Sequence, residues 1–141
     1  MTLVREDIIT LIENNIGNEE EIRVSSTIPD YVDKLMEKAQ IITYYSRGSL
    51  KGVIAYYANN LETKQAYLSL ILIDKRFQSM GIGRLLFEAA KFDLSRNNFL
   101  TFDLEVLNTN SRAQDFYRKY NFKLFEEKEK SVIMRLLINK N

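Results

Sequence analysis

The sequence predicts a mixed α/β sandwich with one strand–helix–strand crossover inside an otherwise antiparallel set of strands. Three patterns predict this class. Two stretches of helical periodicity open the chain, three strand-like runs follow, and helix and strand patterns then alternate before two final strands. A length of 141 residues fits one domain, so we expect a single domain over residues 1–141. The order of the strands in the sheet is not visible from these patterns.

The first two elements are predicted helices. In "DIITLIENN", Ile8, Leu11 and Ile12 fall on one helical face, and Asn15 closes the helix. In "IPDYVDKLMEKA", Pro29 suits the first turn. The apolar residues of this second helix recur at four-residue spacing and are Tyr31, Leu35 and Ala39. The stretch between the helices, "NEEEIRVSST", has no clear period and is interpreted as a loop.

Three strands are predicted next. "QIITYYS" and "LKGVIAYYA" are rich in β-branched and aromatic residues and flank a turn at Arg47-Gly48-Ser49, which indicates a hairpin. The third run, "AYLSLILI", is apolar at both odd and even positions. This pattern is typical of a central strand that is covered on both faces.

The second half alternates helix and strand. Residues 82–94 carry an apolar helical stripe made of Ile82, Leu85, Leu86, Ala89 and Phe92. The strand "LTFDLEVL" has one apolar parity, whereas Asp103 and Glu105 share the largely polar one. Thr109 or Asn110 can cap the following helix, and Asn121 can end it with a positive φ. "FKLFEE" and "SVIMRLLI" are the last two strands.

Composition excludes several kinds of chemistry. The chain has no cysteine and no histidine, so disulfides, zinc–thiolate sites and a cysteine nucleophile are excluded and no metal is expected. Proton transfer must use carboxylates, tyrosine, lysine, water or backbone. A net charge of +1 gives no electrostatic reason to expect a nucleic acid or an anionic membrane as partner.

The N-terminal residues give no targeting signal. "MTLVREDIITLIENN" has acidic residues where a secretory signal needs an apolar core, and nothing approaches ~20 consecutive apolar residues. We therefore expect a soluble cytoplasmic protein.

Gly81 and Gly83 stand between the third strand and the next helix. The first turn of a helix leaves amide hydrogens unpaired at its electropositive end, so this loop can cradle a phosphate or diphosphate. Ordinary turn chemistry explains such a glycine pair equally well. A Walker loop is disfavoured because Arg84 and Leu85 follow Gly83, and a dinucleotide fingerprint is disfavoured by Leu86.

Two motifs give the chain a specific resemblance. "ILIDKRFQSMGIGRLL" resembles the acetyl-CoA loop of the GNAT superfamily of N-acetyltransferases, whose pattern is Arg/Gln-x-x-Gly-x-Gly/Ala. "LEVLNTNSRAQDFYRKYNF" resembles that family's strand, asparagine-containing bulge and helix ending in Tyr-x-x-x-Gly-Phe, with Asn121 where glycine is usual. The family normally opens with a strand, which is absent here, displaced, or contained in "EEIRVSS".

The resemblance implies a mostly antiparallel central sheet with helices on both faces and a splayed fourth and fifth strand pair. Acetyl-CoA is the implied co-substrate, with its pantetheine arm in the gap between those strands and its diphosphate on the loop. The implied cofactor-binding residues are Ile71, Leu72, Ile73, Gln78, Ser79, Met80, Gly81, Ile82, Gly83, Arg84, Asn108, Asn110, Ala113 and Tyr117.

The implied reaction is direct transfer of an acetyl group to an amine, without a covalent enzyme intermediate. Tyr117 matches the tyrosine that protonates the leaving thiolate, and its ordinary pKa of about 10 is near that of a thiol, about 8.5. Glu105 is the leading candidate for the base that accepts the amine proton, and Asp103 is the reserve. A water chain without an essential carboxylate is the alternative.

The resulting hypothesis is an acetyl-CoA-dependent N-acetyltransferase that acts on a small-molecule amine, with an amino sugar as one candidate. Tyr31, Tyr56 and Tyr57 are candidates to line the acceptor pocket. The alternatives are acetylation of a peptide or protein N-terminus and a non-catalytic CoA-binding sensor module. The apolar "VIMRLLI" segment is compatible with a homodimer through edge strands, which the family often forms.

Overall fold

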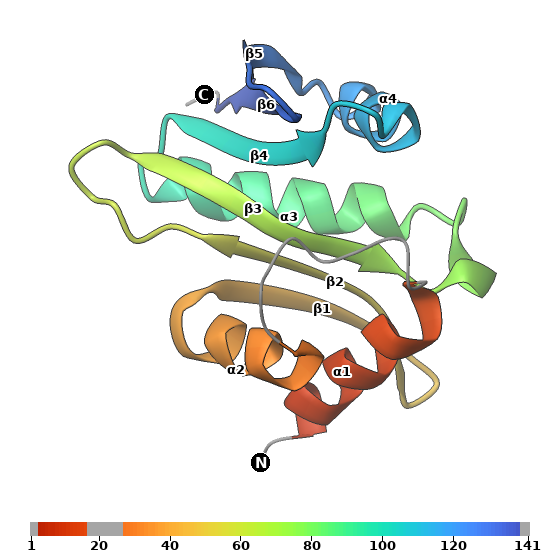
Figure 1. Cartoon of the computed structure of the whole chain (residues 1–141). Helices are drawn as coiled ribbons and strands as arrows, with labels where there is room; N and C mark the ends of the chain where they lie inside the picture. Colours follow the sequence, from red (N-terminus) through yellow and green to blue (C-terminus); the bar gives the residue numbers. More distant parts are fainter. Residues whose placement is uncertain (1–2, 17–26, 139–141) are drawn as a thin grey trace.

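The computed structural model describes residues 3–16 and 27–138 (Figure 1). Its elements follow the order that the sequence predicts. They are α1 (Leu3–Asn15), α2 (Ile28–Lys38), β1 (Gln40–Ser46), β2 (Ser49–Tyr57), β3 (Gln65–Ile73), a 3₁₀ turn η1 (Lys75–Phe77), α3 (Ile82–Arg96), β4 (Thr101–Leu107), α4 (Ser111–Lys119), β5 (Lys123–Glu127) and β6 (Ser131–Leu137).

The six described strands form one mixed sheet in the order β1-β2-β3-β4-β6-β5. Every neighbouring pair is antiparallel except β3 and β4, which are parallel and joined through α3. A parallel pair requires a long crossover, and α3 supplies it. The predicted mixed, mostly antiparallel fold is confirmed.

Helices cover both faces of the sheet (Figure 1). One core lies between the sheet and α1 with α2, and includes Ile8, Ile12, Val32 and Leu35. The other lies between the sheet and α3, and α4 packs against its margin. Side chains of a strand alternate between the two cores, which explains why β2 and β3 are apolar at both parities.

Rings from several elements hold the second core together. Phe87 of α3 stacks on Tyr120, just beyond α4, with ring centroids 4.4 Å apart. Phe122 contacts both Phe87, at 5.9 Å, and Phe102 of β4, at 5.7 Å. This cluster fixes α3 and the end of α4 against β4.

Local signals at helix ends are confirmed. Pro29 lies in the first turn of α2, and Asn110 accepts a hydrogen bond from the Ala113 amide at the start of α4. Thr27, which the sequence analysis did not single out, caps α2 by accepting a hydrogen bond from the Asp30 amide. Asn121 adopts a φ of 75° after α4, as expected for a left-handed stop.

The predicted stripe of α3 is partly wrong. Leu85 and Phe92 are 57% and 67% exposed, whereas the buried face of the helix carries Leu86, Ala90 and Leu94. The helix is apolar on more than one side, so its periodicity alone did not fix which side faces the sheet. The possible first strand in "EEIRVSS" lies outside the described residues.

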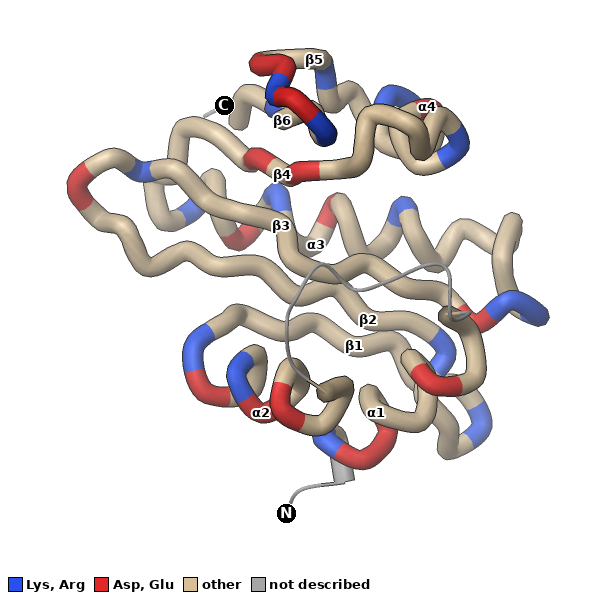
Figure 2. The backbone as a smooth tube through the Cα atoms, viewed as in Figure 1, with Lys and Arg blue, Asp and Glu red and all other residues tan. Residues whose placement is uncertain are grey.

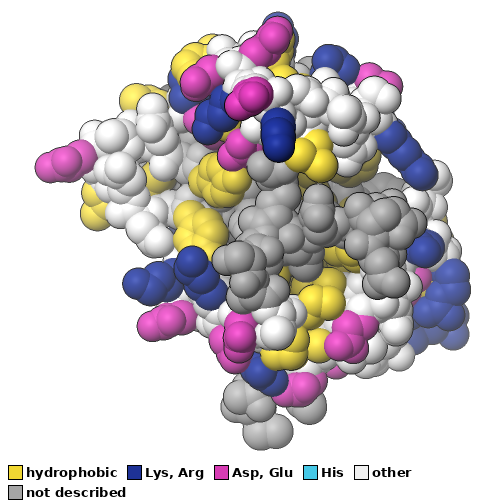
Figure 3. Space-filling view, viewed as in Figure 1, with side chains coloured by type: hydrophobic (Ala, Val, Ile, Leu, Met, Phe, Trp, Pro, Cys, Tyr) yellow, Lys and Arg dark blue, Asp and Glu magenta, His cyan; other side chains and the backbone are white. Residues whose placement is uncertain are grey.

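Charges of both signs are spread over the chain (Figure 2). On the face shown in Figure 3, basic and acidic side chains are interspersed around hydrophobic ones. The described residues on this face form no one-sided basic stripe of the kind that is typical of nucleic-acid binding. The segment "VIMRLLI", on which the edge-strand homodimer is based, belongs largely to β6, which pairs with β4 and β5 and is therefore not an edge strand. β5 is the exposed edge strand at this end of the sheet, with Leu124 and Phe125 about half exposed, and a homodimer stays a prediction.

The α3 helix packs closely against β2 at Gly52. A Cβ atom there would lie 2.9 Å from Ile82 Cγ2 and 3.2 Å from Leu86 Cδ1. We expect Gly52→Ala to lower the free energy of unfolding by about 0.5–2 kcal/mol, because overpacking exceeds the gain from removing a strand glycine. Urea titration measures this change. An equal or higher stability would show that α3 can move away from β2 without cost.

Candidate active site

The site begins where β3 separates from β4. The resemblance implies a separation between the fourth and fifth strands, but β4 and β5 are not neighbours, and among the described strands the separation falls between the third and the fourth. The two strands pair only from Gln65 to Tyr67 and from Thr101 to Asp103, although β3 continues to Ile73 and β4 to Leu107 (Figure 1). Beyond Tyr67, β3 has only β2 as a strand partner in the described part of the chain. Alternate amides and carbonyls of this segment therefore face the opening and need other partners.

The predicted pantetheine contacts lie on this open edge of β3. Ile71, Leu72 and Ile73 belong to its unpaired part, next to the start of the glycine loop. The predicted acetyl-CoA loop therefore lies next to the separation of β3 from β4.

A bulge at Ser69 marks the open edge. Leu68 pairs with Tyr56 and Leu70 with Ala55, so Ser69 is an extra residue on β3. The bulge reverses the side-chain parity, because Leu68 enters the core under α3 and Leu70 the core under α1 and α2.

Tyr31 of α2 contacts this bulge. Its buried hydroxyl lies 2.7 Å from Ser69 Oγ and 3.2 Å from the Ser69 carbonyl, to which it donates. Burial raises the pKa of Tyr31 to about 12, so the hydroxyl stays a donor at neutral pH. α2 thereby stabilises the irregular backbone beside the opening, a contact that the sequence did not reveal.

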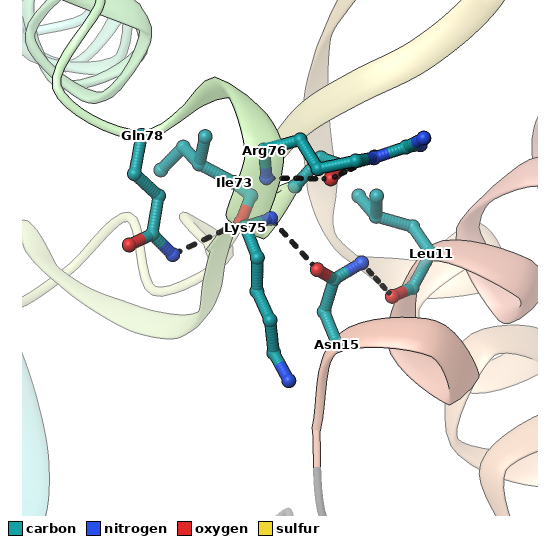
Figure 4. Close-up of polar contacts among 7 residues, drawn as sticks. Leu11, Asn15, Ile73, Lys75, Arg76 and Gln78 are labelled. Atoms are coloured by element: carbon teal, nitrogen blue, oxygen red, sulfur yellow. Dashed lines mark hydrogen bonds and ion pairs between the residues drawn. The ribbon is translucent and has the colours of Figure 1, made fainter.

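A short, well-bonded turn leads from β3 to the loop (Figure 4). The Asp74 amide donates to the Lys51 carbonyl of β2 at 2.8 Å, and the Asp74 carboxylate accepts from the Arg76 amide and guanidinium. These contacts with Arg76 hold the pKa of Asp74 below its usual range. Gln78 donates to the Ile73 carbonyl at 3.3 Å, so the side chain of this motif residue binds the end of β3.

The backbone amides of the loop find no acceptor among the described residues. Within the described ranges, no hydrogen bond is donated by the amides of residues 78–84. Gly81 is the N-cap of α3 with a φ of 85° and no side-chain cap, and Ser79 also has a positive φ of 70°. Unpaired amides at the positive end of a helix form a ready anion site.

The two loop glycines have different roles. A Cβ at Gly81 would meet nothing within 4 Å, so only its positive φ requires glycine. At Gly83, a Cβ would lie 3.2 Å from the Tyr120 hydroxyl and 3.5 Å from Ile73 Cδ1. Gly83 therefore permits close packing of α3 on the end of α4, a role that the motif did not indicate.

The other predicted loop residues are accessible. Ser79, Met80 and Arg84 are exposed, whereas Ile82 is buried under the start of α3. Arg84 forms no ion pair with any described residue. Its guanidinium is thus available for a phosphate, and this contact stays a prediction.

Tyr117 lies on α4 beside the opening and is partly buried against Phe116 and Phe122, with ring centroids 5.4 and 5.9 Å away. Its hydroxyl has no hydrogen-bond partner in the described part of the chain. Burial and the neighbouring Tyr67 raise the pKa of Tyr117 to about 12. It is therefore a neutral donor at physiological pH.

Several tyrosines gather near Tyr117. Tyr31 interacts electrostatically with Tyr57, Tyr67 and Tyr117, so these four residues form what we call the tyrosine cluster. Tyr67 is 41% exposed and pairs with Asp103 at the last contact between β3 and β4. Tyr56 is a correction to the predicted acceptor pocket, because it points to the opposite face and donates to Asp93 at 2.6 Å.

The two carboxylates of β4 have different partners. Asp103 accepts two hydrogen bonds from Arg135, at 2.7 and 2.8 Å, and the guanidinium also lies 3.6 Å from the centroid of the Phe125 ring. Glu105 accepts from the Ser131 hydroxyl, and the Lys128 ammonium lies 3.9 Å away. A bidentate guanidinium neutralises Asp103, so Glu105 remains the better candidate base.

Asn108 and Asn110 of the second motif stabilise the segment that leads from β4 into α4. The side-chain amide of Asn108 donates to the Glu129 carbonyl at 3.2 Å, and the backbone carbonyl of Asn108 accepts from the side-chain amide of Gln114. Asn110 caps α4 through the Ala113 amide. These contacts are internal to the protein, so the contacts of Asn108, Asn110 and Ala113 with a cofactor stay predictions.

The sequence was compared with models of protein families and with curated proteins. The family model for an acetyltransferase (GNAT) domain matches residues 14–134, and no curated protein matches the chain. None of the helices in residues 3–16 and 27–138 combines the length and apolar character needed to cross a bilayer.

Three solved structures illustrate the shared fold. The ribosomal-protein-S18-alanine N-acetyltransferase from Escherichia coli is 17% identical, with a TM-score of 0.75 over 99% of this chain and 90% of that one. The PaiA N-acetyltransferase from Thermoplasma acidophilum, in complex with coenzyme A, is 17% identical, with a TM-score of 0.76 over 94% and 92%. Ard1 from Thermoplasma volcanium is 22% identical, with a TM-score of 0.76 over 96% and 93%.

The raised pKa of Tyr117 predicts a loss of stability at high pH. The unfolded tyrosine ionises near pH 10 and the folded one near pH 12, so the stabilisation is complete below pH 10 and is lost as the pH rises towards 12. Two pKa units correspond to about 2.7 kcal/mol. Between pH 9 and pH 12, we expect the free energy of unfolding to fall more for the wild type than for Tyr117→Phe, which has no hydroxyl to ionise. The difference between the two falls should be about 2–3 kcal/mol, as measured by urea titration. Parallel pH profiles would contradict the burial of this hydroxyl.

Proposed function

Because the chain belongs to the GNAT acetyltransferase family, we propose that it moves the acetyl group of acetyl-CoA directly to the primary amine of a small molecule. One observation carries the proposal: β3 leaves β4 after Tyr67, and the open edge of β3 leads into a loop with unpaired amides. A slot beside an anion site suits a long thiol arm that ends in a diphosphate.

The chain offers fitting contacts along the length of acetyl-CoA. Amides and carbonyls of Ile71, Leu72 and Ile73 would bind the pantetheine arm, since they lie on the open edge of β3. The amides of residues 78–84 would bind the diphosphate, and Arg84 would add a charged hydrogen bond. The open space at Gly81, where a Cβ would meet nothing within 4 Å, leaves room for a phosphate to approach the helix end.

When bound, acetyl-CoA supplies a thioester whose carbonyl carbon forms a bond with the amine nitrogen while the carbon–sulfur bond breaks. An amide on the open edge of β3 would stabilise the negative charge on the carbonyl oxygen. Tyr117 would donate its phenolic proton to the departing sulfur, and the same hydroxyl would later regain a proton from water.

The pKa of Tyr117 limits how it acts. At about 12, it lies roughly 3.5 units above a thiol in water, so complete transfer would be uphill by about 4.8 kcal/mol. The burial that raises the pKa of Tyr117 also disfavours a thiolate in the same slot, which reduces this difference. Tyr117 therefore acts first as a hydrogen-bond donor, and the proton follows as charge accumulates on sulfur.

The incoming amine must lose a proton. Glu105 is proposed as the acceptor, directly or through water, since it lies on the same parity of β4 as Asp103, whose carboxylate is held by two hydrogen bonds from Arg135. Tyr31 and Tyr57 of the tyrosine cluster lie on this face of the sheet and would attract the amine before it is deprotonated, because aromatic ring faces attract ammonium groups.

An acceptor screen tests the proposal. Release of free thiol from acetyl-CoA is measured with amino sugars, polyamines, amino acids and peptides with free N-termini. We expect turnover with one of the small amines. Turnover with N-terminal peptides alone would make a protein the acceptor, and no turnover together with tight CoA binding would support a sensor module.

Removal of the Tyr117 hydroxyl tests the proposed acid. We expect Tyr117→Phe to lower kcat about 10²-fold, the lower range for one acid–base group, with the affinity for acetyl-CoA changed less than about twofold. Thiol release gives kcat, and calorimetry gives the affinity. Unchanged turnover would remove Tyr117 from the mechanism.

A second variant tests the loop. Valine strains a backbone with positive φ, so Gly81→Val is expected to disturb the loop amides and weaken acetyl-CoA binding about tenfold or more in calorimetry. Gly48→Val is the matched control, because Gly48 also has a positive φ, 81°, and open space around it, but lies in the β1–β2 turn. If both variants bind acetyl-CoA like the wild type, the loop is not the diphosphate site.

A further inference from the structure

Asn15 is a polar residue in an apolar position. It follows Ile8, Leu11 and Ile12 on the core-facing side of α1 and is only 8% exposed. An apolar side chain would be expected there, since burying an amide is unfavourable unless its polar atoms are paired. The sequence alone indicated a helix end at Asn15 and nothing more.

Both polar atoms of this side chain are paired (Figure 4). Nδ2 donates to the Leu11 carbonyl in the last turn of α1 at 2.8 Å, and Oδ1 accepts from the Lys75 amide at 2.8 Å. Lys75 is the first residue of the η1 turn, which leads to the glycine loop. Asn15 thus joins the end of α1 to the turn that precedes the proposed diphosphate site.

The loop depends on that turn for its position. Residues 78–84 donate no backbone hydrogen bonds to described residues, so the loop is held mainly where it joins the turn and α3. The turn is anchored to β2 through Asp74 and Lys51. In the described part of the chain, its polar contact with the N-terminal helices is the Asn15 bond.

We propose that Asn15 is a positioning residue for CoA binding, which holds the η1 turn through the Lys75 amide and so presents the loop amides to the diphosphate. The inference rests on the proposed function, because that function assigns the loop to CoA. Without the bond, the turn can take more positions, and CoA must order it on binding. The effect therefore falls on affinity for CoA, not on the acyl transfer step, which takes place at the other end of the slot.

The same helical pair holds the open edge of β3 at a second point. Arg5 of α1 forms an ion pair with Asp33 of α2, and Tyr31 of α2 binds the Ser69 bulge. Asn15 and Tyr31 thus connect the α1–α2 layer to the η1 turn after β3 and to the Ser69 bulge, respectively.

Asn15→Leu is the first test variant. It removes both hydrogen bonds but places an apolar side chain of similar size in the core of α1. We expect the Kd for CoA and the KM for acetyl-CoA to rise about tenfold, with kcat at saturating acetyl-CoA within about twofold of the wild type. The midpoint of thermal unfolding should change little, because added apolar burial offsets the lost bonds.

Lys75→Pro tests the partner atom. Proline removes the amide hydrogen together with the lysine side chain, and its ring fits the first position of a helical turn. Asp74 already has the extended ψ of 131° that a residue before proline requires. Lys75→Ala is its reference, because both variants lack the lysine side chain. We expect Lys75→Pro to bind CoA about tenfold more weakly than Lys75→Ala, and Asn15→Leu to add less than about twofold in the Lys75→Pro background.

Tyr56→Phe is the matched control for a lost buried hydrogen bond. It removes the bond to Asp93, near the far end of α3, and CoA affinity should remain that of the wild type. If the wild type binds no CoA, the proposed function fails. If the wild type binds CoA, then equal binding by Asn15→Leu, or full additivity with Lys75→Pro, overturns the role of Asn15 alone. Should Asn15→Leu not fold, the Lys75→Pro and Lys75→Ala pair decides by the same criterion.

Discussion

The structure depends on one interruption of backbone pairing. Parallel strands β3 and β4 share only three register positions before they separate, and each unpaired residue leaves polar groups that must find other partners. A sheet interrupted in this way would be a liability at its edge. Here the opening lies within the sheet, with α2 on one side through Tyr31 and with α4 beside it, so its polar groups are available to a ligand but shielded from another strand.

The rest of the fold keeps that opening in shape. The aromatic contacts of Phe87, Tyr120 and Phe122 fix α3 and α4 against β4 on one face. The α1–α2 core fixes β2 and β3 on the other face. The core under α3 contains residues of β2 and β3 as well as β4 and β6, so it holds both halves of the sheet on one face. The core under α1 and α2 contains residues of β2 and β3 and holds that half alone on the other face.

Burial also sets the chemistry of the site. The apolar surroundings that exclude water raise the pKa of Tyr31 and Tyr117 to about 12, because they disfavour the phenolate. The protein has no histidine, so a neutral tyrosine is the group that can donate a proton beside the slot over the whole physiological pH range. Asp103, in contrast, is committed to Arg135 and supports the sheet.

The sequence by itself determined features that depend on a few neighbouring residues. The order of elements, the Asn110 cap and the stop at Asn121 all follow from local backbone preferences. The two motifs also led to the family, although the cofactor contacts remain proposals. Only the tertiary structure decided which side of α3 faces the sheet, why Gly83 must be small, and that Asn15 and Tyr31 reach the turn and the bulge of β3. These contacts join residues 37 to 60 positions apart, and no local pattern records which distant side chain will lie opposite a given backbone group.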